Sequence, residues 1–333
     1  MTRSRLWKPL RGISAGTLLG VLLLVPAMNP PQAAGCYNQT VRDAAFRYPR
    51  DMHRLAVVAG REDPEGNAVY SRLEQWLHTS GRGLNLELSL VDPEDPEVSW
   101  EELGVPSAPP SWPVVVLAGG NSNWRSRPSF LIDHWEPEPS AADLEVLASS
   151  PAREEIRSEA ARRLAVLVYV PASDSGSGAL EVLESVARRW SAEEPLGVGL
   201  VQVDRKDQRE RLLLAFMGAA DAGPGLAAVV FGPGKMSVPL RGGEITAERL
   251  DRLIDPLSGD CTCLQSPYAL GVDIPMKWDE THDRAVVALR GEELQTASAS
   301  GSGRVLKAAA GTLGGLVLLV GLATAWIMRR RLL

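Results

Sequence analysis

Cysteine is scarce in this chain of 333 residues, which contains only three. Three cysteines are too few for a small scaffold held together by disulfides. The four histidines are scattered, and we expect surface or packing roles for His78 and His134. The sequence contains no His-Glu-x-x-His zinc motif, no Gly-x-Ser-x-Gly nucleophile motif and no complete phosphate-binding loop. It therefore carries no motif of the common metalloprotease, serine hydrolase or nucleotide-binding classes.

Basic residues are sparse in the body of the chain and concentrated at its ends. The first 34 residues carry four bases and no acid, and the last 30 carry five bases and no acid. The residues between them carry the remaining 26 bases against 41 acids, a net charge of −15. Because so acidic a body repels phosphate backbones, we expect no nucleic-acid partner. A hydrophobic content of 45% with 23% charged residues is typical of a folded globular protein.

An uncharged apolar run near the start predicts export. It covers residues 13–25, follows the four bases, and precedes Pro26 and the small residues 33–35. This three-part pattern is typical of a secretory signal, so we predict a signal peptide over residues 1–34. An alternative is a lipoprotein signal in which Cys36 is acylated.

A second uncharged run near the end predicts a membrane anchor. Its 21 residues, 308–328, precede three arginines. As a helix such a run extends about 31 Å, enough to cross a bilayer. We predict a transmembrane helix over 305–328 and a cytosolic tail over 329–333. By the positive-inside rule, the body lies outside the cytosol of a single-pass cell-membrane protein.

Three further features refine this topology. The polar stretch 296–303 before the anchor predicts a flexible tether. Gly311 and Gly315 have the spacing that lets two membrane helices approach closely, so a helix dimer is possible. Arginine outnumbers lysine thirty to five, which is typical of a GC-rich bacterial genome and makes the predicted compartment the periplasm.

An internal repeat organises the body. Three short apolar runs of the kind that buried strands need occur in both copies. Leu55–Val58 recurs as Leu164–Leu167 after 109 residues, and Val114–Leu117 recurs as Ala228–Phe231 after 114. The runs 84–91 and 198–203 end 112 residues apart, at Val91 and Val203. A helical pattern follows the first run in each copy. Each copy ends in a helix, which is capped by Ser140 in the first copy and by Thr246 in the second.

This order of elements resembles the thioredoxin fold, over residues 50–150 and 163–257. The resemblance implies an α/β protein with two tandem thioredoxin-like domains, each a mixed sheet with flanking helices. Between them, a serine cap followed by proline predicts a connecting helix. The predicted organisation of the body is domain 1 over 35–150, a connecting helix over 151–163, domain 2 over 164–260, and a Cys-x-Cys tail with its tether over 261–303.

The catalytic motif of thioredoxins is missing. These proteins need Cys-x-x-Cys where the first strand meets the helix, and the two junctions here, 60–66 and 171–178, contain no cysteine. Ser173, Ser175 and Ser177 are interpreted as turn and capping residues. Pro113 fits the position at which thioredoxin-like proteins carry a cis-proline; the alternative is an ordinary trans proline at the start of a strand.

The cysteines leave three interpretations open. Cys36 can form a structural disulfide with Cys261 or Cys263. Cys261 and Cys263 can instead form a redox-active pair. A metal site, such as one for copper, would recruit the same two thiolates with Met276 or His282. The segment 261–273 resembles part of a group of bacterial exported proteins with tandem thioredoxin-like units and a terminal anchor, and this resemblance implies no activity.

The sequence thus predicts a non-catalytic binding or assembly module, anchored in the membrane and facing away from the cytosol. We expect no cofactor and no resident metal. A membrane or exported protein is the expected partner. The alternatives are a thiol-disulfide oxidoreductase that uses Cys261 and Cys263, and copper binding through the same pair.

Overall fold

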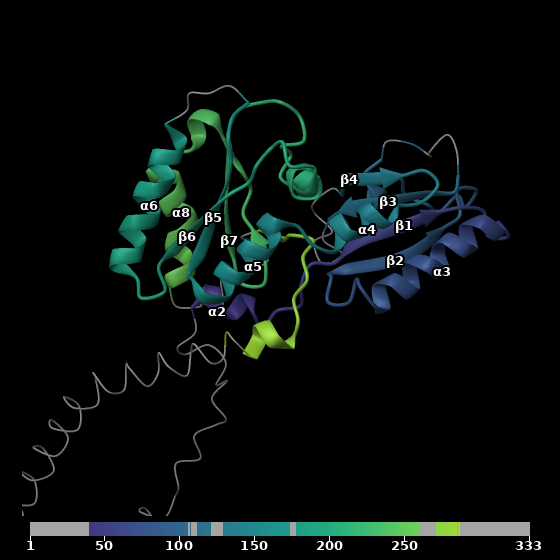
Figure 1. The fold of residues 1–333 in the computed structure, drawn as a ribbon, viewed down its shortest axis with the longest axis horizontal. Helices are drawn as coiled ribbons and strands as arrows, with labels where there is room; N and C mark the ends of the chain where they lie inside the picture. Colours follow the sequence, from purple (N-terminus) through teal and green to yellow (C-terminus); the bar gives the residue numbers. More distant parts are fainter. Residues whose placement is uncertain are drawn as a thin grey trace, which may run out of the picture. The chain divides into compact units, whose positions relative to one another are not determined.

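The structure is a computed structural model that describes residues 40–105, 107, 112–120, 129–173, 178–259, 271–284 and 286 (Figure 1). Its elements up to the connecting helix are α2 (Val41–Ala45), β1 (His53–Val58), α3 (Pro64–His78), β2 (Leu86–Val91), the 3-10 helix η1 (Glu101–Leu103), β3 (Val114–Gly119), β4 (Phe130–Trp135), α4 (Ala141–Ala148) and α5 (Pro151–Arg162). The elements that follow are β5 (Ala165–Val170), α6 (Ala179–Glu193), β6 (Val198–Gln202), η2 (Gln208–Glu210), α7 (Arg211–Phe216), β7 (Leu226–Phe231), β8 (Lys235–Met236), β9 (Leu240–Arg241), η3 (Gly242–Glu244), α8 (Ala247–Ser258) and β10 (Val272–Asp273).

Two mixed sheets share one strand order. The first sheet is ordered β2-β1-β3-β4, with β2 parallel to β1 and with β3 and β4 each antiparallel to its neighbour. The second contains β6-β5-β7-β8 with the same directions, and adds β10 beside β8 and β9 beside β7. A parallel pair joined through a helix, followed by two antiparallel strands, is the arrangement of the thioredoxin fold. The predicted α/β class and thioredoxin-like fold are confirmed.

The strand registers show that equivalent residues of the two repeats are separated by a constant number of positions in the sequence. Val58 pairs with Val114 in the first sheet, and Val170 pairs with Leu226 in the second, so equivalent residues are 112 positions apart in β1 and in β3. The alignment of Leu55 with Leu164 expected from the sequence is therefore wrong by three residues, because Leu55 corresponds to Leu167. Both faces of these strands are buried, so their apolar residues do not alternate and cannot fix a register.

Three helices begin at the capping residues that the sequence predicts, and α3 begins after a cap that it did not identify. Asp63 caps α3, whose first residue is Pro64, and Ser140 forms a capping box with α4. Ser150 caps the connecting helix α5, and Thr246 caps α8. Each capping side chain accepts a hydrogen bond from a backbone N–H of the first helical turn, which has no partner inside the helix.

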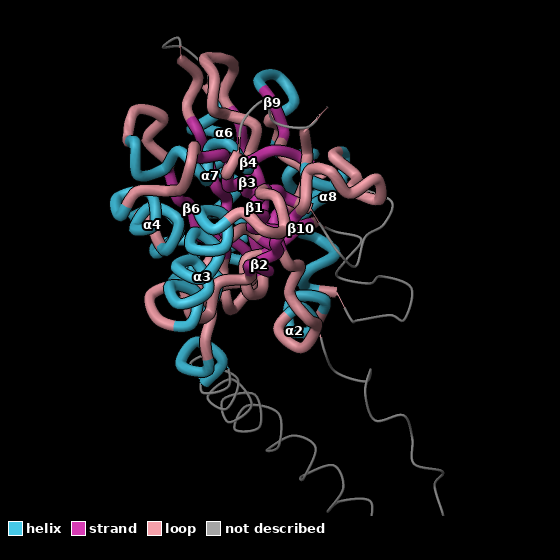
Figure 2. Tube along the Cα trace, turned by 90° about the vertical axis from the view of Figure 1, so that its right-hand side faces the viewer, coloured by secondary structure: helices cyan, strands magenta, loops and turns pink. Residues whose placement is uncertain are grey.

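The two repeats contribute to one hydrophobic core. This core contains Val57 and Leu73 of the first repeat, Ile156 of the connecting helix, and Val168 of the second repeat. A second core lies between the opposite face of the second sheet and helices α6 and α8 (Figure 1). Figure 2 shows the same elements after a turn of 90°, with α3 beside β2 in both views.

Buried charged side chains fix the start of the connecting helix. Glu210 Oε2 accepts a hydrogen bond from Ser150 Oγ at 2.6 Å, and its Oε1 accepts one from Ala152 N at 2.8 Å. Arg153 donates to Leu147 O of α4 at 3.2 Å and to Pro275 O at 2.8 Å. Burial lowers the pKa of Arg153 to about 10, so it stays charged at neutral pH.

The first described segment packs against the second repeat, and the last described segment contacts both repeats. Helix α2 packs in the core of the second repeat through Val41 and Ala45, although the sequence assigned residues from 35 onward to the first domain. At the other end, β10 pairs with β8, and Trp278 N then donates to Gly83 O of the first repeat at 3.0 Å. The segment 271–284 therefore contacts both repeats, and from here on we call it the tail.

The predicted signal peptide and transmembrane helix, including Gly311 and Gly315, lie outside the described residues. None of the helices that the structure describes is long and apolar enough to cross a bilayer.

Candidate functional site

The first candidate site is the junction between β1 and α3, where thioredoxins carry their nucleophile. Arg61 occupies this loop, with its Nε 3.3 Å from Asp92 Oδ2 and its Nη2 3.2 Å from Asp95 Oδ2. Asp63 accepts a hydrogen bond from Glu65 N at 3.0 Å and so caps α3. Arginine keeps its proton in proteins and is no nucleophile. The junction thus presents an exposed network of ion pairs where a thiolate would act.

Pro113 lies beside this junction, directly before β3. The Trp112–Pro113 peptide bond is cis, and the Trp112 side chain is 46% exposed. The register places Gly225 at the equivalent position of the second repeat, directly before Leu226. Pro224 corresponds to Trp112, so the second repeat lacks a proline at this point.

Hydrogen bonds join Ser173, in the described part of the second junction, to the loop before β7. Ser173 N donates to Gly223 O at 3.1 Å, and Gly223 N donates to Ser173 Oγ at 3.0 Å. Arg205 contacts the same loops through the carbonyl oxygens of four residues: Pro171 at 3.2 Å, Ala219 at 2.8 Å, Pro224 at 3.3 Å, and Asp221. Ser173 therefore serves as a turn residue. Ser175 and Ser177 lie outside the described residues.

A buried charged cluster lies at the contact between the repeats and the tail, and we call it the buried clamp. Its members are Asp51, His53, Lys235 and Asp273, and each is at most 1% exposed. Lys235 Nζ lies 2.8 Å from Asp51 Oδ2 and 3.2 Å from Asp273 Oδ2. Each aspartate also accepts the other's backbone N–H, at 2.7 and 3.0 Å. The clamp therefore ties the segment before β1, strand β8 and the tail together.

The electrostatics of the clamp favour a structural role. Burial lowers the pKa of His53 to about 4, so the imidazole is neutral at neutral pH. Its Nε2 lies 2.6 Å from Asp273 O, an acceptor, so Nε2 is the protonated nitrogen. Burial raises the pKa of Asp273, and the charge of Lys235 opposes this shift. Burial also lowers the pKa of Arg50 to about 10. The four members of the clamp are excluded from water, so they hold the fold together and are not accessible to a substrate.

The remaining predicted site residues are distributed as follows. Cys36, Cys261 and Cys263 lie outside the described residues. Met276 is 2% exposed in the tail, and His282 Nδ1 lies 2.9 Å from Asp279 Oδ1. The described residues contain no group of three side chains from His, Cys, Asp and Glu that could hold a metal ion. His134 is exposed on β4, and His78 lies at the end of α3.

Sequence reasoning missed the clamp. Lys235 is 184 residues from Asp51, and Asp51 is 222 residues from Asp273. The only signal was a charged or polar residue at the edge of an apolar run, as at Lys235 beside Met236 and at His53 before Leu55. Such a residue indicates either a solvent-exposed strand end or a buried ion pair, and only the fold shows which.

The chain matches no family model and no curated protein. Solved structures with some similarity include the alkylhydroperoxide reductase AhpF of Enterococcus faecalis, at 14% identity over 65% of this chain and 95% of that one, with a TM-score of 0.21. Zinc-bound human ERp44 shows 9% identity over 66% and 59%, with a TM-score of 0.23. The first two thioredoxin domains of Saccharomyces cerevisiae Eps1p show 12% identity over 62% and 92%, with a TM-score of 0.22. At such scores the fold assignment depends on the strand order and directions given above.

Proposed function

We propose that this protein is a non-catalytic binding or assembly module built on two thioredoxin-like domains. The observation that carries the proposal is the state of the two strand-to-helix junctions. Neither contains a cysteine; Arg61 with its carboxylate partners occupies the first, and Arg205 donates a hydrogen bond to Pro171 O at the start of the second. A thioredoxin-like frame without a thiolate at these points can present surfaces, but it cannot exchange disulfides there.

The proposal includes the location predicted from the sequence. A signal peptide over 1–34 and a helix over 305–328 would hold the body outside the cytosol, tethered by the residues before the anchor. An anchored module meets other membrane proteins more often than an unanchored module would, because both are confined near one surface, which raises their effective concentration. It also shares its compartment with exported proteins. The partner is accordingly proposed to be such a protein.

The test is an insulin-reduction assay with the full-length protein in detergent. We expect a rate equal to that of dithiothreitol alone, and the same rate after all three cysteines are changed to serine. A faster rate that disappears in the Cys261→Ser and Cys263→Ser variants would establish the oxidoreductase alternative instead. A faster rate that survives all three substitutions would contradict the reasoning about the junctions.

The oxidoreductase and copper alternatives depend on Cys261 and Cys263. Asp260 precedes the pair, and an adjacent acid disfavours a thiolate. Mass spectrometry of the non-reduced protein distinguishes the three interpretations. A Cys36 cross-link to either partner supports the structural disulfide, and a bond between Cys261 and Cys263 with free Cys36 favours the redox pair. Stoichiometric copper that is lost on Cys261→Ser supports the metal site.

A further inference from the structure

Strand β2 leaves one edge of the first sheet open among the described residues. It pairs with β1 on one side, where His53 N donates to Asn85 O and Ala59 N donates to Val91 O. In a parallel ladder, backbone groups alternate between the two sides of a strand. The odd-numbered residues of β2 therefore face β1. The N–H and C=O groups of Leu86, Leu88 and Leu90 point to the open edge.

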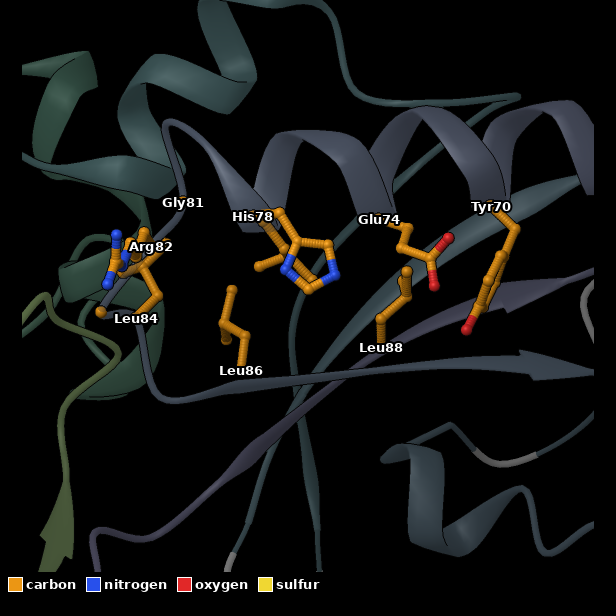
Figure 3. A pocket seen from close by; sticks show the side chains of 10 residues that line it. Tyr70, Glu74, His78, Gly81, Arg82, Leu84, Leu86 and Leu88 are labelled. Atoms are coloured by element: carbon orange, nitrogen blue, oxygen red, sulfur yellow. The ribbon is translucent and has the colours of Figure 1, made fainter.

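Two of these leucines, Leu86 and Leu88, line a groove between β2 and α3. The groove has a volume of about 650 Å³. Its apolar floor includes Leu86 and Leu88, which point toward the helix (Figure 3). Leu90 continues this row and is 38% exposed. Long apolar edges are normally shielded, because their free backbone groups and side chains pair with other strands. This edge has both features that a strand-addition site needs.

The rim of the groove is charged with opposite signs. Arg82 lies beside Leu84 at one end, and Glu74 lies across from Leu88 (Figure 3). Both side chains are exposed, and no ion pair joins either of them to another described residue. Leu84 and Leu88 are four residues apart, about 13 Å along a strand. An occupant would therefore meet a positive group at one end of the groove and a negative group about four strand residues farther along.

We propose that the edge of β2 binds an extended segment of a partner protein by antiparallel strand addition. This deepens the proposed binding role and rests on it. In that direction, apolar side chains lie opposite Leu90 and Leu86, a basic side chain faces Glu74, and an acidic one faces Arg82. The complementary sequence is apolar-x-basic-x-apolar-x-acidic, since alternate side chains of a strand share one face. Main-chain hydrogen bonds supply affinity, and the charges select the sequence.

The experiment measures fluorescence polarisation of two labelled peptides with the full-length protein in detergent. The first is Val-Thr-Lys-Thr-Val-Thr-Glu, and the second exchanges its Lys and Glu. We expect the first to bind at least about tenfold more tightly, the effect of about 1.4 kcal/mol. The doubly reversed variant Glu74→Lys with Arg82→Glu should invert this preference. Equal binding of both peptides to both proteins would overturn the proposal.

A matched pair of variants separates this edge from the other edge of the sheet. Leu90 on β2 is 38% exposed, and Leu131 on β4 is 39% exposed. Leu90→Lys should weaken binding of the first peptide at least about tenfold, and Leu131→Lys should leave it unchanged. The reverse result would place the peptide on β4 and overturn the proposal. Circular dichroism of both variants confirms that they are folded.

Other occupants of the edge give different results. If Leu90→Lys converts a dimer into a monomer in sedimentation velocity, a second copy of the chain fills the edge. If peptide binding appears only after the tether, residues 296–303, is deleted, the chain's own tether fills the edge. Either result would overturn the proposal that a partner segment binds this edge. Neither result concerns disulfide chemistry, which the insulin assay tests separately. Failure of this surface is therefore distinguishable from failure of the proposed function.

Discussion

Lys235 Nζ lies 2.8 Å from Oδ2 of Asp51, across 184 residues of sequence and with both side chains excluded from water. Lys235 belongs to β8 of the second repeat, and Asp51 lies two residues before β1 of the first. Asp273 completes the contact from the tail. One buried ammonium group thus holds three separate parts of the chain, and the charges that it compensates have no access to solvent.

Replacing Lys235 should therefore be costly. Lys235→Met leaves two buried carboxylates without their cation, so we expect the free energy of unfolding to fall by about 3–5 kcal/mol. The measurement is urea unfolding at pH 7, followed by tryptophan fluorescence. Lys206→Met is the matched control, because Lys206 is exposed, and it should change the free energy by less than about 0.5 kcal/mol.

A rescue experiment separates the lost charge from the lost side chain. Adding Asp51→Asn and Asp273→Asn to Lys235→Met removes the uncompensated carboxylates and should restore part of the stability. If the triple variant is no more stable than Lys235→Met, the electrostatic explanation is wrong.

His53 should make the stability depend on pH. Burial lowers its pKa from 6.5 to about 4 in the folded protein, so the unfolded chain binds more protons between these values. The free energy of unfolding should then fall as the pH drops from about 6.5 to 4, by at most about 1.4 kcal/mol per pH unit. Unfolding curves measured at pH intervals of one half test this slope.

Other charged groups lie around His53, so a control variant is needed to assign the pH dependence to this residue. Arg50, Asp51 and Lys235 act on the pKa of His53 through their charges, and the ring of Phe216 lies 5.5 Å away. The raised pKa of Asp273 acts in the opposite direction, since its stabilisation is lost as the pH rises through that pKa. His53→Gln should flatten the slope of the free energy of unfolding against pH between pH 4 and 6.5. An unchanged slope would show that other groups cause the pH dependence.

The first junction allows a steric test with two glycines. An added Cβ at Gly66 would lie 2.1 Å from the Cβ of Ala59, whereas nothing lies within 4 Å of one at Gly60. Gly66→Ala should lower the free energy of unfolding by about 1–3 kcal/mol through overpacking, despite the better helix propensity of alanine. Gly60→Ala should be nearly neutral. Combining Gly66→Ala with Ala59→Gly should recover the loss, and failure to recover would point to a cause other than this contact.

The proposed topology has a direct test in intact spheroplasts. With the body outside the cytosol, added protease should digest it while leaving a cytosolic marker protein intact. Complete protection of the body, under conditions that digest a known exported protein, would show that the orientation is reversed.

The sequence alone determined the long strands, the main helices and their order in each repeat. Ser140, Ser150 and Thr246 marked helix starts because a cap is a short-range hydrogen bond between neighbours in the chain. The sequence also showed that neither junction contains a cysteine. The positions of the long strands followed from apolar runs. A buried strand needs apolar residues whichever strands lie beside it.

Only the tertiary structure decided register and long-range charge pairing. Strands buried on both faces carry no alternation, so the alignment of Leu55 with Leu167 emerged only from strand pairing. The open edge of β2 likewise depends on which strands lie beside it. The contact of Lys235 with Asp51 and Asp273 arises because folding brings three separate segments together and excludes water, and no local pattern in the chain encodes it.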